Sequence, residues 1–184
     1  TVPGDDELQA GAARFNLLCD LLAGARGRLA EGTLPGGSPA LQALYDRCAT
    51  SSLDEGAEAA EAMAAAPDPA GTSGDDPPVF LFGNVLPGAE VFELLESCGA
   101  RVVGEDLCTG SRQFLRVSAD GEDPLAALAA SLLARVPCAR TIDATNPGQM
   151  AALLLNAAQA SGARGVICHT LKFCDPYLAR IPYI

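Results

Sequence analysis

The sequence predicts an α/β fold, half of a doubly wound parallel sheet of the flavodoxin or Rossmann kind, preceded by a helical segment. Two observations lead to this prediction. Three short apolar runs, at 79–82, 101–104 and 165–168, alternate with stretches of helical periodicity, as the buried strands of a parallel sheet do. A stretch rich in Pro, Gly and Asp, residues 67–78, forms a linker between this pattern and the helical patterns before it.

The part before the linker, residues 1–66, is predicted to be a helical segment of three helices. Apolar residues recur at helical spacing over 7–30, and two shorter helical patterns follow. The first of these begins after Ser38, and the second after Ser52 or Ser51. Because a serine hydroxyl accepts the free backbone N–H groups of a first turn, we expect these serines to cap the two helices.

The α/β domain is expected over residues 79–184. We expect it to be truncated at its C-terminus, because the chain ends on Pro182-Tyr183-Ile184, in mid-element. Helical patterns between the predicted strands cover residues 89–98, 124–135 and 147–160. Asn146 followed by Pro147 resembles a helix cap with proline at the first helical position.

Composition excludes several classes of function. The formal net charge is −11, from 23 acidic and 12 basic residues, which disfavours binding to nucleic-acid phosphates. No apolar run is long enough to span a membrane. The N-terminus has neither the basic region nor the apolar region of a signal peptide. We therefore expect a cytoplasmic protein without nucleic-acid or membrane partners.

The seven cysteines favour a reducing compartment. Their number is odd, their spacing is wide, and no two of them form a C-x-x-C pair. This argues against a disulfide framework, a zinc ribbon and a thioredoxin-type site. Most of these thiols should therefore behave as small core hydrophobes, so that only those in loops or at strand ends are candidates for chemistry.

The chemistry-bearing residues cluster where the predicted strands end. In an open parallel sheet, ligands bind just beyond the carboxyl ends of the strands. Segments Gly83-Asn84, Glu105–Arg112 and His169–Asp175 follow the three strands and should meet at one edge. Neither a G-x-G-x-x-G fingerprint nor a Walker lysine motif is present, so a classical dinucleotide or ATP site is not indicated.

Each candidate also has a structural interpretation. Cys174, beside Lys172, is either a thiolate that binds metal or attacks, or a buried structural thiol. Cys108 is either a ligand or a loop thiol that lines a pocket. His169 can exchange protons or be a satisfied strand-end residue. Arg112 can clamp a phosphate or carboxylate or form a surface salt bridge, and Glu105 with Asp106 can be a solvated strand end.

Three segments resemble those of the 2-hydroxyacyl-CoA dehydratase and benzoyl-CoA reductase family. Glu105–Arg112 (EDLCTGSR) is similar to the family's D-L-C-T-G-S/T-R segment. His169–Tyr177 (HTLKFCDPY) is similar to its H-T-L-K-F-C-D-P/S-Y segment. Between them, Arg135–Arg140 (RVPCAR) fits the stretch R-V-P-C-x-R. The order and spacing agree, and the resemblance covers roughly residues 79–184.

The resemblance implies two α/β domains per subunit with a [4Fe-4S] cluster between them, held by three cysteines. It implies that Cys174 is one ligand, and that the other two belong to a first α/β domain that this chain lacks. A second homologous subunit, in a heterodimer, and an ATP-dependent iron-sulfur activator protein are the implied partners. The resemblance also implies that the substrate is an acyl-CoA and that the protein acts in anaerobic metabolism.

The implied reaction is a lyase reaction, incomplete in this fragment alone. One electron on the thioester carbonyl gives a ketyl radical anion, which expels the α-hydroxyl and makes the β-proton acidic. We expect His169 or Glu105 to move protons, and Arg112, Ser111 and Cys108 to bind substrate. Two alternatives stay open, a benzoyl-CoA reductase-like subunit, and a non-catalytic partner subunit or binding module without a cluster.

Overall fold

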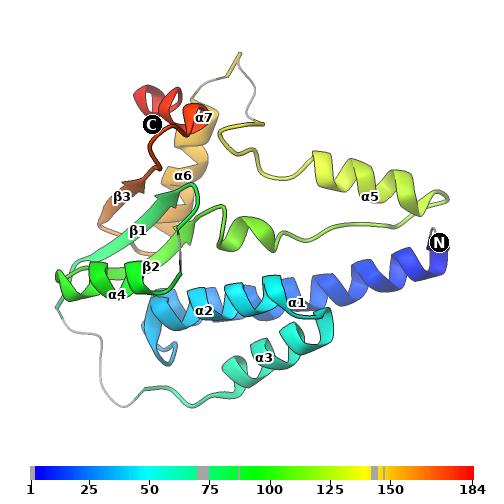
Figure 1. Ribbon diagram of the computed structural model, residues 1–184, viewed down its shortest axis with the longest axis horizontal. Helices are drawn as coiled ribbons and strands as arrows, with labels where there is room; N and C mark the ends of the chain where they lie inside the picture. The colour runs from blue at the N-terminus through cyan, green and yellow to red at the C-terminus, as the bar shows by residue number, and fades with distance from the viewer. Residues whose placement is uncertain (1–2, 70–74, 87, 142–144, 147) are drawn as a thin grey trace.

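The computed structural model describes residues 3–69, 75–86, 88–141, 145–146 and 148–184, and it shows an α/β fold preceded by a helical segment (Figure 1). The sheet lies at one end of the molecule, and α5 extends alongside α1 at the other. The α-helices and strands are, in chain order, α1 Asp5–Glu31, α2 Gly37–Thr50, α3 Leu53–Ala65, β1 Pro78–Gly83, α4 Glu90–Ser97, β2 Arg101–Asp106, α5 Pro124–Leu133, α6 Gln149–Ala160, β3 Gly165–His169 and α7 Asp175–Leu178. Short 3-10 turns lie at Ser111–Gln113 and Ile181–Tyr183.

Helices α1, α2 and α3 form their own apolar core, as predicted from their periodicity. The buried residues Leu22, Leu41 and Tyr45 lie at its centre. Ser52 caps α3 as predicted, accepting the N–H of Glu55 in a capping box. The predicted cap of α2 is wrong: Gly36 occupies the cap position, and Ser38 lies inside the helix.

Ser38 has a different role, because it joins the helical segment to the α/β part. Its hydroxyl is buried and donates to Glu96 Oε1 of α4 at 2.6 Å. Tyr45 of α2 stacks on Phe114, with ring centroids 5.6 Å apart. Helix α1 also packs against β2. The middle of the predicted linker, residues 70–74, lies outside the described residues.

The sheet has three parallel strands in the order β2-β1-β3, which confirms the predicted half of a doubly wound sheet. Alternate residues of β1 face two apolar layers. Phe80 and Phe82 pack with α6, whereas Val79 and Leu81 pack with α4. The central strand is therefore buried on both faces, as its continuous apolar run predicts.

Three details of the α/β part differ from the prediction. Strand β2 continues to Asp106, so Glu105 belongs to the strand rather than to the loop after it. Strand β3 is not fully buried: Val166 is 52% exposed and Cys168 is exposed, because α6 packs against β1 and β2. Helix α6 begins at Gln149 with Gly148 as its cap, so Asn146 is not the cap, and Pro147 lies outside the described residues.

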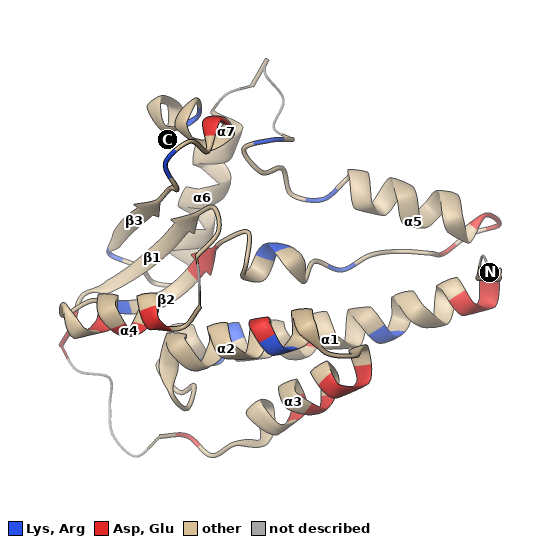
Figure 2. Ribbon diagram, in the orientation of Figure 1, with Lys and Arg blue, Asp and Glu red and all other residues tan. Residues whose placement is uncertain are grey.

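Figure 2 shows acidic residues along α3 and α4 and at the start of α1. Among the described residues, no helix is both long and apolar enough to cross a membrane.

Candidate active site

The carboxyl ends of the three strands meet at one edge, as the sequence predicts. The ends of β1 and β3 lie closest, since Gly83 pairs with His169. Gly83 has φ of +151°, and a Cβ at this position would overlap the carbonyl oxygen of His169. Strand order reverses on either side of β1, so this edge is the topological switch point where ligands bind in open α/β sheets.

Glu105 is a buried carboxylate that organises the loop after β2. It accepts the backbone N–H of Leu107 at 3.0 Å and that of Ser111 at 3.0 Å. Burial raises the pKa of Glu105, although the Ser111 and Leu107 amides and the hydroxyl of Tyr45 oppose that rise. Gly110 is required here, because a Cβ would meet the carboxylate. Whether Glu105 also moves protons stays a prediction.

Arg112 is fixed in place by an ion pair with two contacts. Its Nε lies 2.5 Å from Asp106 Oδ1, and its Nη2 donates to Asp106 Oδ2 at 2.6 Å. Its Nη1 donates to the carbonyl oxygen of Pro137 at 3.3 Å. Burial lowers the pKa of Arg112, the Asp106 carboxylate raises it, and the net result is a pKa above the ordinary value. The guanidinium therefore stays charged. The guanidinium of Arg112, the predicted anion-binding group, is therefore held in a preorganised position.

Two clefts meet at Arg112. The larger, of about 490 Å³, lies between α1, β2 and α6, and Glu105 and Ser111 are among its lining residues. The smaller, of about 320 Å³, is lined by Cys108, Cys138 and apolar side chains that include Leu115 and Val136. The three predicted substrate-binding residues, Arg112, Ser111 and Cys108, thus line two clefts that share the Arg112 side chain.

Cys138 is a residue to which sequence analysis assigned no role. Burial raises the pKa of its thiol, but N–H groups of Arg140 and Thr141, the Thr141 hydroxyl and the charge of Arg112 lower it below the ordinary value. The Arg140 N–H lies 3.4 Å from the sulfur. By contrast, burial raises the pKa of Cys108. The matched segment RVPCAR was the available signal for Cys138.

Tyr177 and Asn84 were also not predicted as site residues. Tyr177 of α7 is 3% exposed, and its hydroxyl has no hydrogen-bond partner among the described residues. Burial raises the pKa of this hydroxyl, and the charge of Arg112 opposes that rise. The signal for Asn84 was a polar residue directly after a fully apolar strand.

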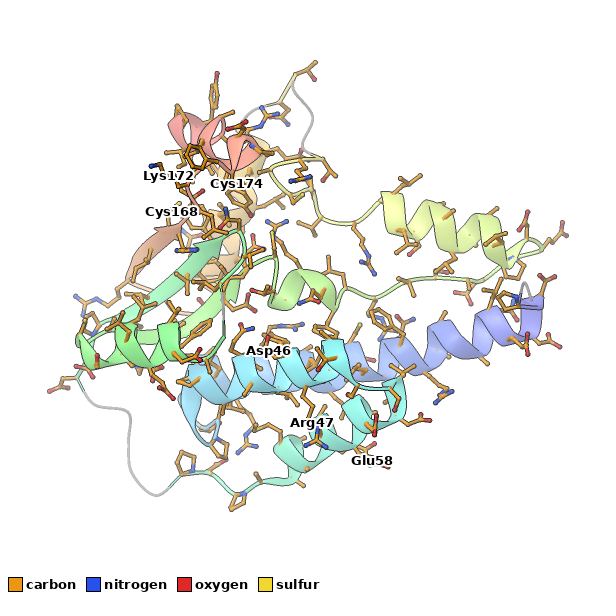
Figure 3. The ribbon with its side chains drawn as sticks, viewed as in Figure 1. Asp46, Arg47, Glu58, Cys168, Lys172 and Cys174 are labelled. Carbon is orange, nitrogen blue, oxygen red and sulfur yellow. The ribbon has the colours of Figure 1, made fainter. Side chains whose placement is uncertain are left out.

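Cys174 lies at the cap position of α7, just beyond β3, with its thiol half-buried. It borders the same apolar cluster as Cys108. Lys172 lies over the ring of Phe173, 5.0 Å from its centroid, and Figure 3 shows Lys172 and Cys174 at the α7 end of the molecule. Asp175 is the first residue of α7, and no side-chain cap bond is present at this helix end.

His169 lines neither of the two clefts that share Arg112. Its Nε2 lies 3.2 Å from the carbonyl oxygen of Val85, and among the described residues this is its side-chain hydrogen bond. The same part of the chain contains no group of three or more His, Cys, Asp or Glu arranged to hold a metal ion. Cys174 can therefore supply one thiolate of a metal centre, not a complete set.

Comparison with known proteins agrees with this geometry. The model of the 2-hydroxyglutaryl-CoA dehydratase D-component family matches residues 36–184, which include all three similar segments. No curated protein matches the chain. Because the match covers most of the 184 residues, the chain belongs to the 2-hydroxyglutaryl-CoA dehydratase D-component family.

Proposed function

We propose that this chain contributes one thiolate ligand and part of the acyl-CoA site to a [4Fe-4S]-dependent 2-hydroxyacyl-CoA dehydratase. Such an enzyme is a lyase that removes water from a 2-hydroxyacyl-CoA. The observation that carries the proposal is the convergence of three similar segments at one sheet edge. Arg112, in the segment Glu105–Arg112, donates a hydrogen bond to the carbonyl oxygen of Pro137, in the segment Arg135–Arg140. Cys108 and Cys174 border one apolar cluster.

Cys174 fits one position of such a cluster. Iron-sulfur clusters are held by cysteine thiolates, and this sulfur is half-buried at the ligand-binding edge of the sheet. The sulfur makes no hydrogen bond to any residue that the structure describes, so it is available for ligation. When bound, the cluster supplies a single low-potential electron to the substrate thioester.

Arg112 is suited to binding an anionic part of the substrate. The Asp106 carboxylate and the Pro137 carbonyl fix its guanidinium, so little side-chain entropy is lost on binding. The larger cleft beside it has mostly apolar walls, including Leu115, Val136 and Leu153. Apolar walls exclude water, which a reduced thioester requires.

His169 has more free hydrogen-bonding capacity than Glu105, the other predicted proton carrier. If Nε2 carries the proton donated to Val85, then Nδ1 has a free lone pair and can accept a substrate proton. The carboxylate of Glu105 already accepts two backbone N–H groups. We therefore assign the proton transfer to His169 and retain Glu105 as the group that shapes the loop.

The proposal includes a second homologous subunit and an ATP-dependent activator that delivers the electron. It places the enzyme in the cytoplasm. The protein should be purified anaerobically with its partner subunit and assayed for iron, sulfide and visible absorbance. Turnover of a 2-hydroxyacyl-CoA should require activator and ATP. Cys174→Ser should lose iron and turnover, whereas Cys98→Ser, at an exposed cysteine, should keep both.

Two outcomes separate the alternatives. Retention of full iron content in Cys174→Ser would contradict the ligand role. A wild-type protein that takes up no iron would indicate a non-catalytic partner subunit, and reduction of an aryl-CoA ring would indicate a benzoyl-CoA reductase-like subunit. Unchanged turnover in His169→Ala would remove His169 from the mechanism.

A further inference from the structure

Asn84 joins the ends of all three strands. The residue is 4% exposed and directly follows β1. Its backbone N–H donates to the carbonyl oxygen of His169 at 3.3 Å, and its own carbonyl oxygen accepts the N–H of Cys108 at 3.2 Å. Its side chain extends to the loop after β3, where Oδ1 accepts the N–H of Leu171 at 3.1 Å. Its Nδ2 lies 3.4 Å from the hydroxyl oxygen of Thr170.

The loop that Asn84 holds is strained. Residues Leu171 to Cys174 form a tight turn, closed by the N–H of Cys174 donating to the carbonyl oxygen of Leu171 at 3.1 Å. At its third position Phe173 has φ of +71°, a conformation that glycine or asparagine normally supplies. The Phe173 side chain is 80% exposed, so burial of its ring does not offset the strain. Contacts elsewhere must hold this turn.

We propose that Asn84 is a positioning residue for Cys174. By binding Leu171, the first residue of the turn, it fixes where the turn leaves the sheet edge and hence where the Cys174 sulfur lies. An amide suits this task because one side chain must accept from a backbone N–H and donate to a hydroxyl. A carboxylate accepts but does not donate, and its charge is costly to bury.

The relevance to catalysis rests on the proposed ligand role of Cys174, but the geometric claim can be tested without iron. In the iron-free chain, Asn84→Ala should speed hydrogen exchange of the Leu171 amide about fivefold, as expected for one lost hydrogen bond. Alkylation of Cys174 should change rate in the same variant. Asn84→Asp, which keeps the acceptor, should restore slow exchange at Leu171.

Asn16→Ala is the matched control. Asn16 also bridges two segments, since its side chain donates to the Val117 carbonyl at 2.7 Å and accepts the Val117 N–H at 2.8 Å. Asn16→Ala should lower the melting temperature without changing the rate of hydrogen exchange at Leu171 or the rate of alkylation of Cys174. Equal effects of Asn84→Ala and Asn16→Ala on these two rates would overturn the proposal.

Two further measurements complete the test. If Asn84→Ala does not fold, Asn84→Asp and Thr170→Val decide. Both break the contact between Asn84 Nδ2 and Thr170, the first by removing the donor and the second by removing the acceptor, and both should keep Leu171 protected by the side-chain oxygen of residue 84. Rapid exchange at Leu171 in both would contradict the proposal. In iron-loaded protein, Asn84→Ala should change the electron paramagnetic resonance signal of the cluster while Asn16→Ala leaves it unchanged. A wild type without iron would refute the ligand role of Cys174, but the exchange and alkylation rates would still decide the role of Asn84.

Discussion

Removing the carboxylate of Glu105 should destabilise the protein more than any surface carboxylate does. In Glu105→Ala, the backbone N–H groups of Leu107 and Ser111 lose their acceptors, and Leu107 is fully buried. An unsatisfied buried donor costs about 1–3 kcal/mol, so two of them cost about 2–6 kcal/mol. Relief from burying a carboxylate offsets part of this, and we expect a net loss of about 3 kcal/mol.

Urea unfolding followed by circular dichroism measures this loss. Glu105→Gln keeps one acceptor oxygen and turns an NH₂ group toward the other N–H, so it should lose about 1–3 kcal/mol. Glu7→Ala is the matched control, because Glu7 accepts the N–H of Gly4 at 2.9 Å at an exposed helix end. It should lose about 1 kcal/mol or less. A loss below about 0.5 kcal/mol in Glu105→Ala would refute the organising role of the carboxylate.

The pH dependence gives an independent check. Burial raises the pKa of Glu105 in the folded state above its unfolded value, so the folded protein holds this proton more tightly. The stability contributed by Glu105 is therefore fully present below the unfolded pKa and is lost as pH rises through the folded pKa. The difference in unfolding free energy between wild type and Glu105→Gln should shrink from acidic to neutral pH. A difference that grows with pH would contradict the raised pKa.

Two further substitutions and one measurement of thiol reactivity test other parts of the edge. Phe173→Gly should keep or raise the unfolding free energy, by up to about 1 kcal/mol, because glycine adopts the observed positive φ without strain; a clear loss in thermal melts would show that ring contacts hold the turn. Gly83→Ala should lose more than about 3 kcal/mol or fail to fold, because its methyl group would overlap the carbonyl of His169, and a soluble variant with wild-type melting would contradict the close strand approach. At neutral pH Cys138 should be alkylated faster than Cys108, because the pKa of its thiol is lowered while that of Cys108 is raised; mass spectrometry after pulse alkylation measures both rates, and a faster Cys108 would contradict this ranking.

The sequence predicted the sheet well because its signals are local. The continuous apolar run of β1, bounded by proline and glycine, is typical of a strand covered on both faces. The exposure of β3 could not be read in the same way, because Val166 and Cys168 are exposed where α6 packs against β1 and β2 instead. Which strands a helix covers depends on the tertiary arrangement and not on the composition of any strand.

The cap predictions show the same division. Ser52 and Glu55 form a local capping box, which the residue spacing specifies. Ser38 has equally good chemistry for a cap but lies one residue inside α2, where Glu96 of α4 accepts its hydroxyl proton. That partner is distant in sequence, so the tertiary contact decides the role of Ser38. The role of Asn84 was missed for the same reason, since its side-chain partners lie in the loop after β3.

The contacts also separate structure from chemistry within the three similar segments. Cys138 has its sulfur surrounded by donors from Arg140 and Thr141, and Cys108 lies against the buried hydroxyl of Tyr177. These two sulfurs thus already have polar neighbours within the protein. Cys174 differs from both, because no described residue donates to its sulfur and a strained turn holds it at the sheet edge. Phe173 at positive φ bears a conformational cost. Under the proposed ligand role of Cys174, this is the cost of holding its sulfur at the sheet edge.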